Sequence, residues 1–164
     1  MEQEAVELCF GRVDEALAIM QEVSEWGKQM GLRIWPKEWL TREALLGMDV
    51  KEENFCVALY GKSAVGAFIL QEQDQQYWPN ARQGEALYLH KLCVGRKFAH
   101  QNMACRIVGA IAEKCKEEGI SRIRLDTSLD EQKVRKIYLG MGFKIVDIID
   151  YNNGRSMALY EYEI

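Results

Sequence analysis

The sequence predicts a single α+β domain, in which helices flank a mixed β-sheet. Its 164 residues are enough for one domain with a substantial apolar core. Segments with the residue spacing of strands and of helices follow one another in the order β-α-α-β-β-β-α-β-α-β-β. Neither a linker nor an internal repeat interrupts this order, so we expect residues 1–164 to form one domain.

The first half of the chain has several local signals for its predicted elements. Gly31 is suited to end a helix, and Thr41 is a preferred N-cap residue. Two β-rich runs around the sequence Gly-Lys-Ser indicate a hairpin. The predicted elements are, in order, strand 5–10, helix 14–31, helix 41–47, the hairpin 54–73 and a polar loop over 74–85.

Residues 86–94 (ALYLHKLCV) are predicted to form the next strand. In a regular strand, successive side chains point to opposite faces of the sheet. This alternation places one set of side chains on one face (Tyr88, His90, Leu92, Val94) and a second set on the other face (Leu87, Leu89, Lys91, Cys93).

The second half of the chain is more regular. Ser128 and Glu131 have the spacing of a capping box, and we assign Glu131 mainly to helix capping. Asn153-Gly154 is a strong hairpin-turn signal. The predicted elements are a helix over 103–119 that ends at Gly119, strand 121–127, a helix over about 129–139, and strands 143–149 and 156–164.

The bulk composition excludes several classes of protein. The formal net charge is −4 and the pI is about 5.3, which argues against nucleic acid as a partner. The five cysteines form no C-x-x-C pair, so neither a disulfide framework nor a zinc site is expected, and we predict no metal. No apolar run approaches the ~20 residues that span a membrane, and the N-terminus lacks a signal-peptide pattern. We therefore expect a cytoplasmic protein without a membrane partner.

Two segments carry a more specific pattern. In LYLHKLCVGRKFAHQNMA (87–104) a strand runs through a loop into a helix, and in KIYLGMGF (136–143) a helix tyrosine, Tyr138, precedes Gly142-Phe143. Together they resemble the GNAT superfamily of acetyl-CoA-dependent N-acetyltransferases. The resemblance implies the GNAT fold, a mixed and mostly antiparallel twisted sheet of about six to seven strands flanked by about four helices.

The loop of 99–104 departs from the family pattern Q/R-x-x-G-x-G/A, which binds the CoA pyrophosphate. Only Ala104 matches the pattern, and Asn102 stands in place of a glycine. Such a loop binds through backbone N–H groups and the positive end of a helix, and Asn is the non-glycine residue that best tolerates a left-handed φ. We therefore expect a divergent loop that still binds the pyrophosphate. The alternative is a solvated basic loop that only caps a helix.

The resemblance implies acetyl-CoA as the co-substrate and assigns residues to it. Pantetheine would lie along the strand, and the phosphates at the loop, with positive charge from Arg96, Lys97 and Arg106. The residues expected to bind the co-substrate are Leu92, Cys93, Val94, Lys97, Ala99, His100, Gln101, Asn102, Met103, Ala104 and Cys105.

Tyr138 matches the tyrosine that protonates the departing thiolate in the family, and the Val94 N–H matches an oxyanion contact. The alternative role for Tyr138 is packing between helix and sheet. His90 has the reference pKa of a general base near neutral pH, although a lone strand histidine is more often a packed residue. A cysteine mechanism with Cys93 as nucleophile is disfavoured, because side chains three apart on a strand point to opposite faces.

The acceptor is expected to be a primary amine of a small molecule, in preference to a peptide or protein. The first helices and the 71–86 loop are expected to form its site, lined by Trp26, Trp35, Tyr77, Trp78 and Tyr88, with Trp39 nearby; core packing or a dimer contact is the alternative for each. A homodimer stays open. Two other functions compete with catalysis, a non-catalytic acyl-CoA-binding or regulatory module and a structural interaction domain.

Overall fold

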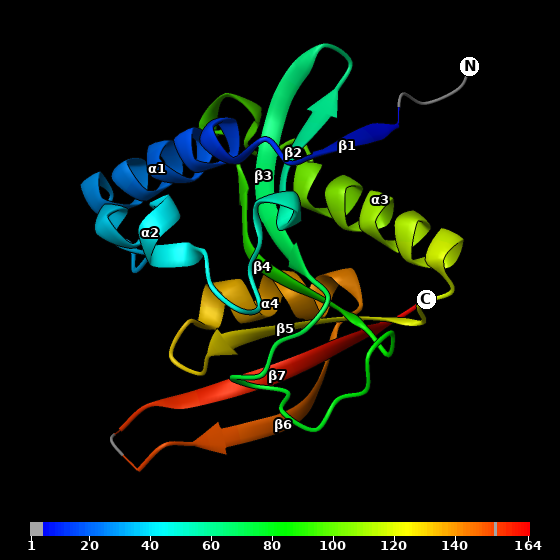
Figure 1. The fold of residues 1–164 in the computed structure, drawn as a ribbon. Helices are drawn as coiled ribbons and strands as arrows, with labels where there is room; N and C mark the ends of the chain where they lie inside the picture. Colours follow the sequence, from blue (N-terminus) through cyan, green and yellow to red (C-terminus); the bar gives the residue numbers. More distant parts are fainter. Residues whose placement is uncertain (1–4, 153) are drawn as a thin grey trace.

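A computed structural model describes residues 5–152 and 154–164, which form a seven-stranded sheet with helices on both faces (Figure 1). The strand order is β1-β2-β3-β4-β5-β7-β6, and only the β4–β5 pair is parallel. This confirms the predicted α+β class and the predicted order of elements. The elements are β1 (Val6–Phe10), α1 (Val13–Gln29), α2 (Arg42–Leu45), β2 (Phe55–Tyr60), β3 (Ser63–Gln71), β4 (Leu87–Val94), α3 (Met103–Glu118), β5 (Arg122–Ser128), α4 (Gln132–Met141), β6 (Lys144–Asp150) and β7 (Ser156–Glu163).

The sheet separates two apolar cores. On one face, α1 packs its Leu17 and Met20 against β2 and β3. On the other face, α3 packs Ile107 and Ile111 beneath the centre of the sheet, and α4 lies beside it with Tyr138. Each helix shows the three-to-four-residue apolar spacing expected of a helix with one buried face. Within the described residues, no helix combines the length and the apolar character that crossing a membrane requires.

Most local signals in the sequence are confirmed, but the predicted start of the helix at 129 and the predicted capping box of Ser128 and Glu131 are wrong. Thr41 is the N-cap of α2 and accepts a hydrogen bond from the Ala44 N–H at 3.1 Å, and Gly119 ends α3 with φ +72°. The helix predicted from 129 begins instead at Gln132, and neither Ser128 nor Glu131 caps it through a side chain. Residues 129–131 form a turn in which the Glu131 N–H bonds to the Ser128 carbonyl. Asn153 of the predicted Asn-Gly turn lies outside the described residues.

A β-bulge in β4 overturns the predicted assignment of its faces. Ala67 pairs with Cys93 and Ile69 pairs with His90, so two residues of β4 stand opposite one residue of β3. Lys91, inside the bulge, has φ +56°. The extra residue reverses the alternation: Leu87, Leu89, Leu92 and Val94 pack on the α3 face, whereas Tyr88, His90 and Cys93 share the α1 face.

A second irregularity separates β4 from β5. The two strands pair only at Leu87–Ile123 and Tyr88–Arg124, at the start of both. Beyond this point β5 continues to pair with β7 on its other side as far as Ser128. A gap therefore opens in the sheet between the ends of β4 and β5, and the backbone groups that line it are not used for sheet pairing.

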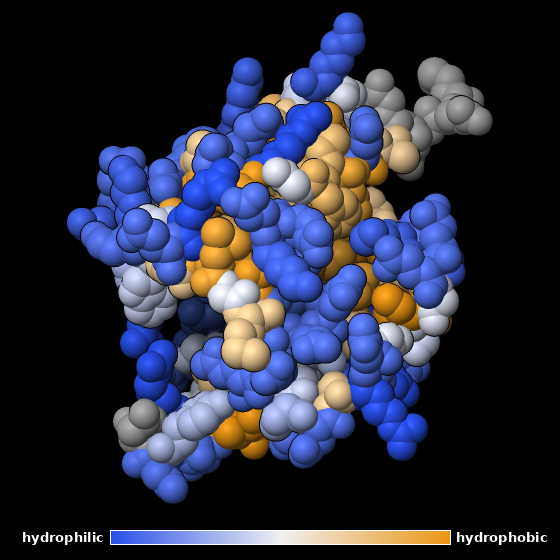
Figure 2. Space-filling view, viewed as in Figure 1, coloured by the Kyte–Doolittle hydropathy of each residue, from blue (hydrophilic) through white to orange (hydrophobic). Residues whose placement is uncertain are grey.

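The visible surface is largely hydrophilic, with an apolar strip between β1 and α3 and a recess between α2 and the β6–β7 end (Figure 2). The strip is part of a groove of about 630 Å³ lined by Val6, Leu8 and Phe10, together with Arg106 and Lys114 of α3. Of the residues predicted for the site, Arg106 alone lines this groove, and the other predicted residues lie elsewhere.

Gly66 of β3 is required by the close approach of β3, β4 and α3. A Cβ atom at Gly66 would lie 2.6 Å from the carbonyl oxygen of Cys93 and 2.8 Å from Cδ1 of Ile107. Because a backbone oxygen cannot move aside cheaply, we expect Gly66→Ala to lower the free energy of unfolding by about 1–3 kcal/mol, measured by denaturant titration.

The matched control is Gly109→Ala in α3, where nothing lies within 4 Å of the added Cβ atom. This change should leave stability unchanged or raise it by up to about 1 kcal/mol, because alanine favours a helix interior. Equal stability of the Gly66→Ala and wild-type proteins would contradict the packing described for β3.

Candidate active site

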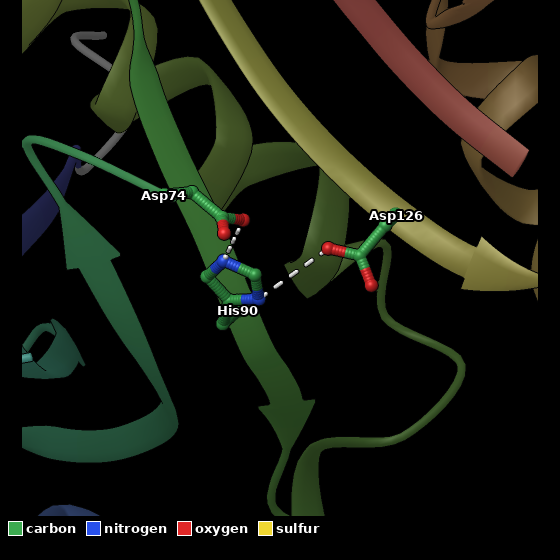
Figure 3. A group of neighbouring side chains, drawn as sticks. All are labelled: Asp74, His90 and Asp126. Carbon is green, nitrogen blue, oxygen red and sulfur yellow. Dashed lines mark hydrogen bonds and ion pairs between the residues drawn. The ribbon is translucent and has the colours of Figure 1, made fainter. Parts of the chain in front are cut away.

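His90 lies between two carboxylates beside the gap in the sheet (Figure 3). Its Nε2 shares a hydrogen bond with Oδ2 of Asp74 at 3.0 Å, and its Nδ1 lies 3.6 Å from Oδ1 of Asp126. The three residues come from different segments: Asp74 from the loop after β3, His90 from β4 and Asp126 from β5. The Tyr77 N–H donates to the other oxygen of Asp74 and so fixes that carboxylate. The group joins β4 to β5 where the two strands have stopped pairing.

The Asp126 carboxyl is the most electrostatically unusual member of this group. Its side chain is 12% exposed, and Oδ1 is buried without a hydrogen-bond partner. Burial raises the pKa of Asp126, and the Asp74 charge raises it further, while His90 and Lys91 act in the opposite direction. A histidine held by one carboxylate, beside a second carboxyl with a raised pKa, is suited to accepting and passing on protons.

These three residue types also bind metal ions, and their ligand atoms lie within 4.8 Å of one another. The two carboxylates, however, approach opposite nitrogens of the ring, so the imidazole stands between them (Figure 3). A cation bound at one ring nitrogen would have one carboxylate beside it, and the other carboxylate would lie at the opposite ring nitrogen. The geometry fits a proton relay better than chelation.

Tyr138 lies on the opposite face of the sheet from His90. Its ring packs edge-on against Phe143 at 5.6 Å and near Tyr160 at 6.3 Å. Burial raises the pKa of the Tyr138 phenol, and the negative charge of Asp126 is the second cause. The phenol therefore stays protonated at neutral pH. Tyr138 packs against the apolar core on the α3 and α4 side of the sheet.

Cys93 is on the same face as His90, contrary to the prediction from strict alternation. A different argument, from the surroundings of the thiol, nevertheless disfavours Cys93 as a nucleophile. Burial raises the pKa of the Cys93 thiol to about 12, and the S–H points to the Ala67 carbonyl at 3.7 Å. A thiol held in this way contains little of the thiolate that nucleophilic catalysis needs.

The glycine-poor loop adopts the backbone that glycines would have supplied. His100 has φ +63° and Asn102 has φ +60°, both in the left-handed region. Asn102 is the N-cap of α3, and its side chain makes no capping hydrogen bond. The first N–H groups of α3, from Met103 onward, have no partner within the helix and point toward the loop. Ala99, Gln101, Ala104 and Cys105 complete this segment, which has the features of an anion-binding helix start.

The positive charges near the loop are arranged differently from the prediction. The Arg96 guanidinium lies 3.4 Å from the ring centroid of Trp26 in α1, and Arg106 lies over Tyr60 at 5.2 Å. Arg106 therefore belongs to the β1–α3 groove and not to the loop. Lys97 remains exposed at the loop.

The aromatic residues predicted for an acceptor site fall into three places, and Trp26 lies apart from the others against Arg96. Tyr77 lies near the His90 group, because its N–H donates to Asp74, and Trp35 lies against Lys91. Burial, together with the charges of Asp126 and Asp74, raises the pKa of Tyr77 to about 12. Trp78 and Tyr88 instead surround Arg124, and the Tyr88 side chain is only 2% exposed. These two line a small pocket of about 170 Å³ beside Asp74. Their role toward an acceptor stays a prediction.

Three residues of the site were not foreseen from the sequence: Asp74, Lys91 and Asp126, the last of which ends a predicted strand without any other signal. Asp74 is three residues beyond the end of β3, and because β3 and β4 are antiparallel, it returns to the level of His90. An acidic residue at the start of a polar loop does not by itself indicate that it will lie beside His90. Lys91 was assigned to the face opposite His90, and only the bulge brings it to the site.

Comparison with known proteins identifies relatives of the chain. Residues 17–143 match a family model described as Acetyltransferase (GNAT) family. An uncharacterized N-acetyltransferase of Bacillus subtilis (strain 168), YesJ, is 32% identical over 80 residues, which are 46% of this chain and 42% of YesJ. The chain therefore covers less than half the length of that relative.

Solved structures share the fold at low sequence identity. A GNAT family acetyltransferase from Listeria monocytogenes superimposes with a TM-score of 0.72 at 18% identity, over 97% of this chain and 95% of its own. One from Elizabethkingia anophelis, solved with acetyl-CoA bound, has a TM-score of 0.52 at 19% identity, over 67% and 75% of the two chains. At these identities the likeness concerns the fold alone.

The buried Asp126 carboxyl generates a stability prediction. Because its pKa is raised in the folded protein, the folded state binds more protons than the unfolded chain, and stability falls as the pH rises through that range. Asp126→Asn should therefore raise the free energy of unfolding at pH 7, by on the order of 1 kcal/mol. The difference should shrink in acid, where the wild-type carboxyl is protonated. Denaturant titrations between pH 3 and 7 measure it.

The matched control is Glu117→Gln, because Glu117 lies on the exposed side of α3. This change removes an exposed charge instead of a buried one, so its effect on the free energy of unfolding should not show the pH dependence expected for Asp126→Asn. An Asp126→Asn protein that is less stable than wild type at pH 7 would mean that the Asp126 charge is compensated, in contradiction to the geometry above.

Proposed function

Since the chain belongs to the acetyltransferase (GNAT) family, we propose that it transfers an acetyl group from acetyl-CoA to the primary amine of a small molecule. Transfer occurs by direct attack of the amine in a ternary complex. The observation that supports this best is the gap between β4 and β5, beside the His90 group, with Tyr138 on the opposite face of the sheet. A thioester placed in the gap would have a proton donor on one side and a proton acceptor on the other.

The end of β4 is suited to hold the pantetheine arm. The Gly95 N–H bonds to the Val65 carbonyl of β3 at 2.8 Å. Because successive N–H groups of an extended chain point in opposite directions, the Val94 N–H points toward the gap. Leu92, Cys93 and Val94 thus offer backbone groups to an added strand-like ligand, and the Val94 N–H is the donor for the thioester oxygen.

Two proton transfers of the reaction are assigned to groups on opposite faces of the sheet. The acceptor enters as an ammonium and gives a proton to His90, which Asp74 holds in place, before its nitrogen forms a bond to the thioester carbon. The carbon–sulfur bond then breaks, the thiolate takes the proton of the Tyr138 hydroxyl, and the nitrogen of the new amide releases its second proton to solvent. The raised pKa of Tyr138 keeps that proton available at neutral pH. Solvent returns both groups to their starting states.

The loop before α3 would bind the pyrophosphate through its backbone. Support comes from the left-handed φ of His100 and Asn102, together with the uncapped start of α3. The acetyl-CoA reported for the Elizabethkingia relative is consistent with such a ligand. The competing function, a non-catalytic acyl-CoA-binding module, shares this loop but needs neither Tyr138 nor His90.

The loop proposal predicts different effects of two changes at Asn102. Asn102→Gly should nearly keep acetyl-CoA affinity, because glycine adopts φ +60° without strain, which offsets the freedom that it adds to the unbound loop, and no side-chain cap is lost. Asn102→Val should weaken affinity by about 10-fold or more, because a β-branched residue is strained at positive φ. Calorimetric titration with acetyl-CoA measures both, and equal affinity of the two variants would contradict a backbone-based site.

Tyr138→Phe is the experiment that tests the proposed function. The change keeps the ring that packs against Phe143 and removes only the hydroxyl, so thermal stability should change little. If the hydroxyl protonates the thiolate, turnover should fall by ~10² or more, while acetyl-CoA affinity should change much less. Thiol release with an accepted amine measures turnover, and calorimetry measures affinity.

Tyr162→Phe is the matched control, because Tyr162 packs against the same Phe143 at 5.2 Å but lies on β7. It should retain near-normal turnover. Near-normal turnover of Tyr138→Phe would rule out the general-acid role, and a purely structural loss would appear as lowered stability.

A further inference from the structure

Lys91 occupies an unusual position for a lysine. It sits in the β4 bulge with φ +56°, immediately after His90. Its ammonium lies 5.4 Å from the ring centroid of Trp35, in the segment that follows α1. The side chain is half-buried, whereas a surface lysine normally extends its ammonium into water.

The ammonium of Lys91 has no anionic partner among residues 5–152 and 154–164. It makes no hydrogen bond and no ion pair there, and it contacts the face of Trp35. Asp126 and Glu131 influence it only through longer-range electrostatics, and burial lowers the pKa of Lys91. If Lys91 served to neutralise Asp126 or Glu131, its ammonium would be expected within hydrogen-bond distance of that carboxylate. Three N–H donors therefore remain free in a partly dehydrated position, which favours an anion from outside the chain.

The position of Lys91 restricts which anion this can be. The phosphates of the co-substrate are proposed to lie at Asn102 and the start of α3, beyond the end of β4. Lys91 lies before that end, directly after His90 in the chain, and the Trp35 ring that it contacts packs against the α1-side core. The free donors are thus on the same face of the sheet as His90, the group that is proposed to deprotonate the amine.

We propose that Lys91 binds an anionic group of the acceptor, so that the acceptors are amino-acid-like molecules with a primary amine at His90 and a carboxylate at Lys91. This inference rests on the proposed acetyl transfer. Asp126 and His90 receive the cationic end of such a molecule and Lys91 receives its anionic end, with Trp35 beside the carboxylate. A diamine would place its second ammonium against Lys91 and be repelled.

The test uses acceptors in matched sets of three: an L-amino acid, its amide and the corresponding amine without the carboxyl group, for example leucine, leucinamide and isopentylamine. Sets with apolar, aromatic and polar side chains are compared by thiol release. In the wild-type enzyme the amino acid should have the highest kcat/KM of its set, by about 10-fold or more, the scale of a charge-assisted hydrogen bond.

Lys91→Met keeps the length of the side chain and removes its charge. It should lower kcat/KM for the amino acid by about 10-fold to 100-fold, mainly through KM, and leave the amide nearly unchanged. Lys91→Arg should restore part of the preference. The matched control is Lys62→Met in the β2–β3 turn, which should have no effect. Thermal unfolding of each variant identifies any loss of folding.

The outcomes separate this inference from the function on which it rests. A wild-type enzyme that prefers the amides or the simple amines would overturn the role of Lys91 and leave acetyl transfer intact. A preference for the amino acids that survives Lys91→Met would do the same. Failure of every amine, charged or neutral, would contradict the proposed acetyl transfer and this inference with it.

Discussion

The opening between β4 and β5 is the constraint on which the arrangement of this protein depends. Two paired positions at the start of the strands hold the two halves of the sheet together, and beyond them the strands separate. Each half is stabilised without the missing pairing, because β4 is bonded to β3 and β5 to β7. The opening lies between two layers, with Tyr138 in the α4 layer and His90 in the α1 layer. A continuous sheet would have no opening between these layers.

The bulge at Lys91 has a comparable effect on the local scale. One extra residue exchanges the two faces of β4 midway, so that the strand is apolar toward α3 on both sides of the bulge while His90 and Cys93 share the opposite face. The strand thereby keeps its core contacts and still presents polar side chains at the gap. Asp126 has an energetic cost to consider as well, since burial raises the pKa of its carboxyl beside His90 and its charged form is therefore expected to be unfavourable for folding.

The sequence predicts the fold well because the apolar spacing of α1 and α3, the hairpin signals and the Gly142-Phe143 pattern are all local or nearly local. It predicts His90 and Tyr138 as candidates through the family resemblance, but it does not predict how they are surrounded. The faces of β4 could not be derived, because a bulge is set by pairing with β3 and leaves no mark in the residue alternation. Asp74 could not be found for a similar reason, since its approach to His90 depends on the path of a long polar loop. The late start of α4 reflects tertiary contacts of the 129–131 turn, which override a capping pattern.

The left-handed residues His100 and Asn102 have a consequence for the thermodynamics of ligand binding. A glycine-rich loop samples many backbone conformations when free, and it loses this freedom when a ligand orders it. Residues with a Cβ atom have fewer conformations to lose, so a loop that already holds them at positive φ is preorganised. The strain is then present in the free protein and is not added on binding. Such a loop should bind its anion with a smaller entropic penalty than its glycine-rich counterparts, and sequence searches that require the glycines will overlook it.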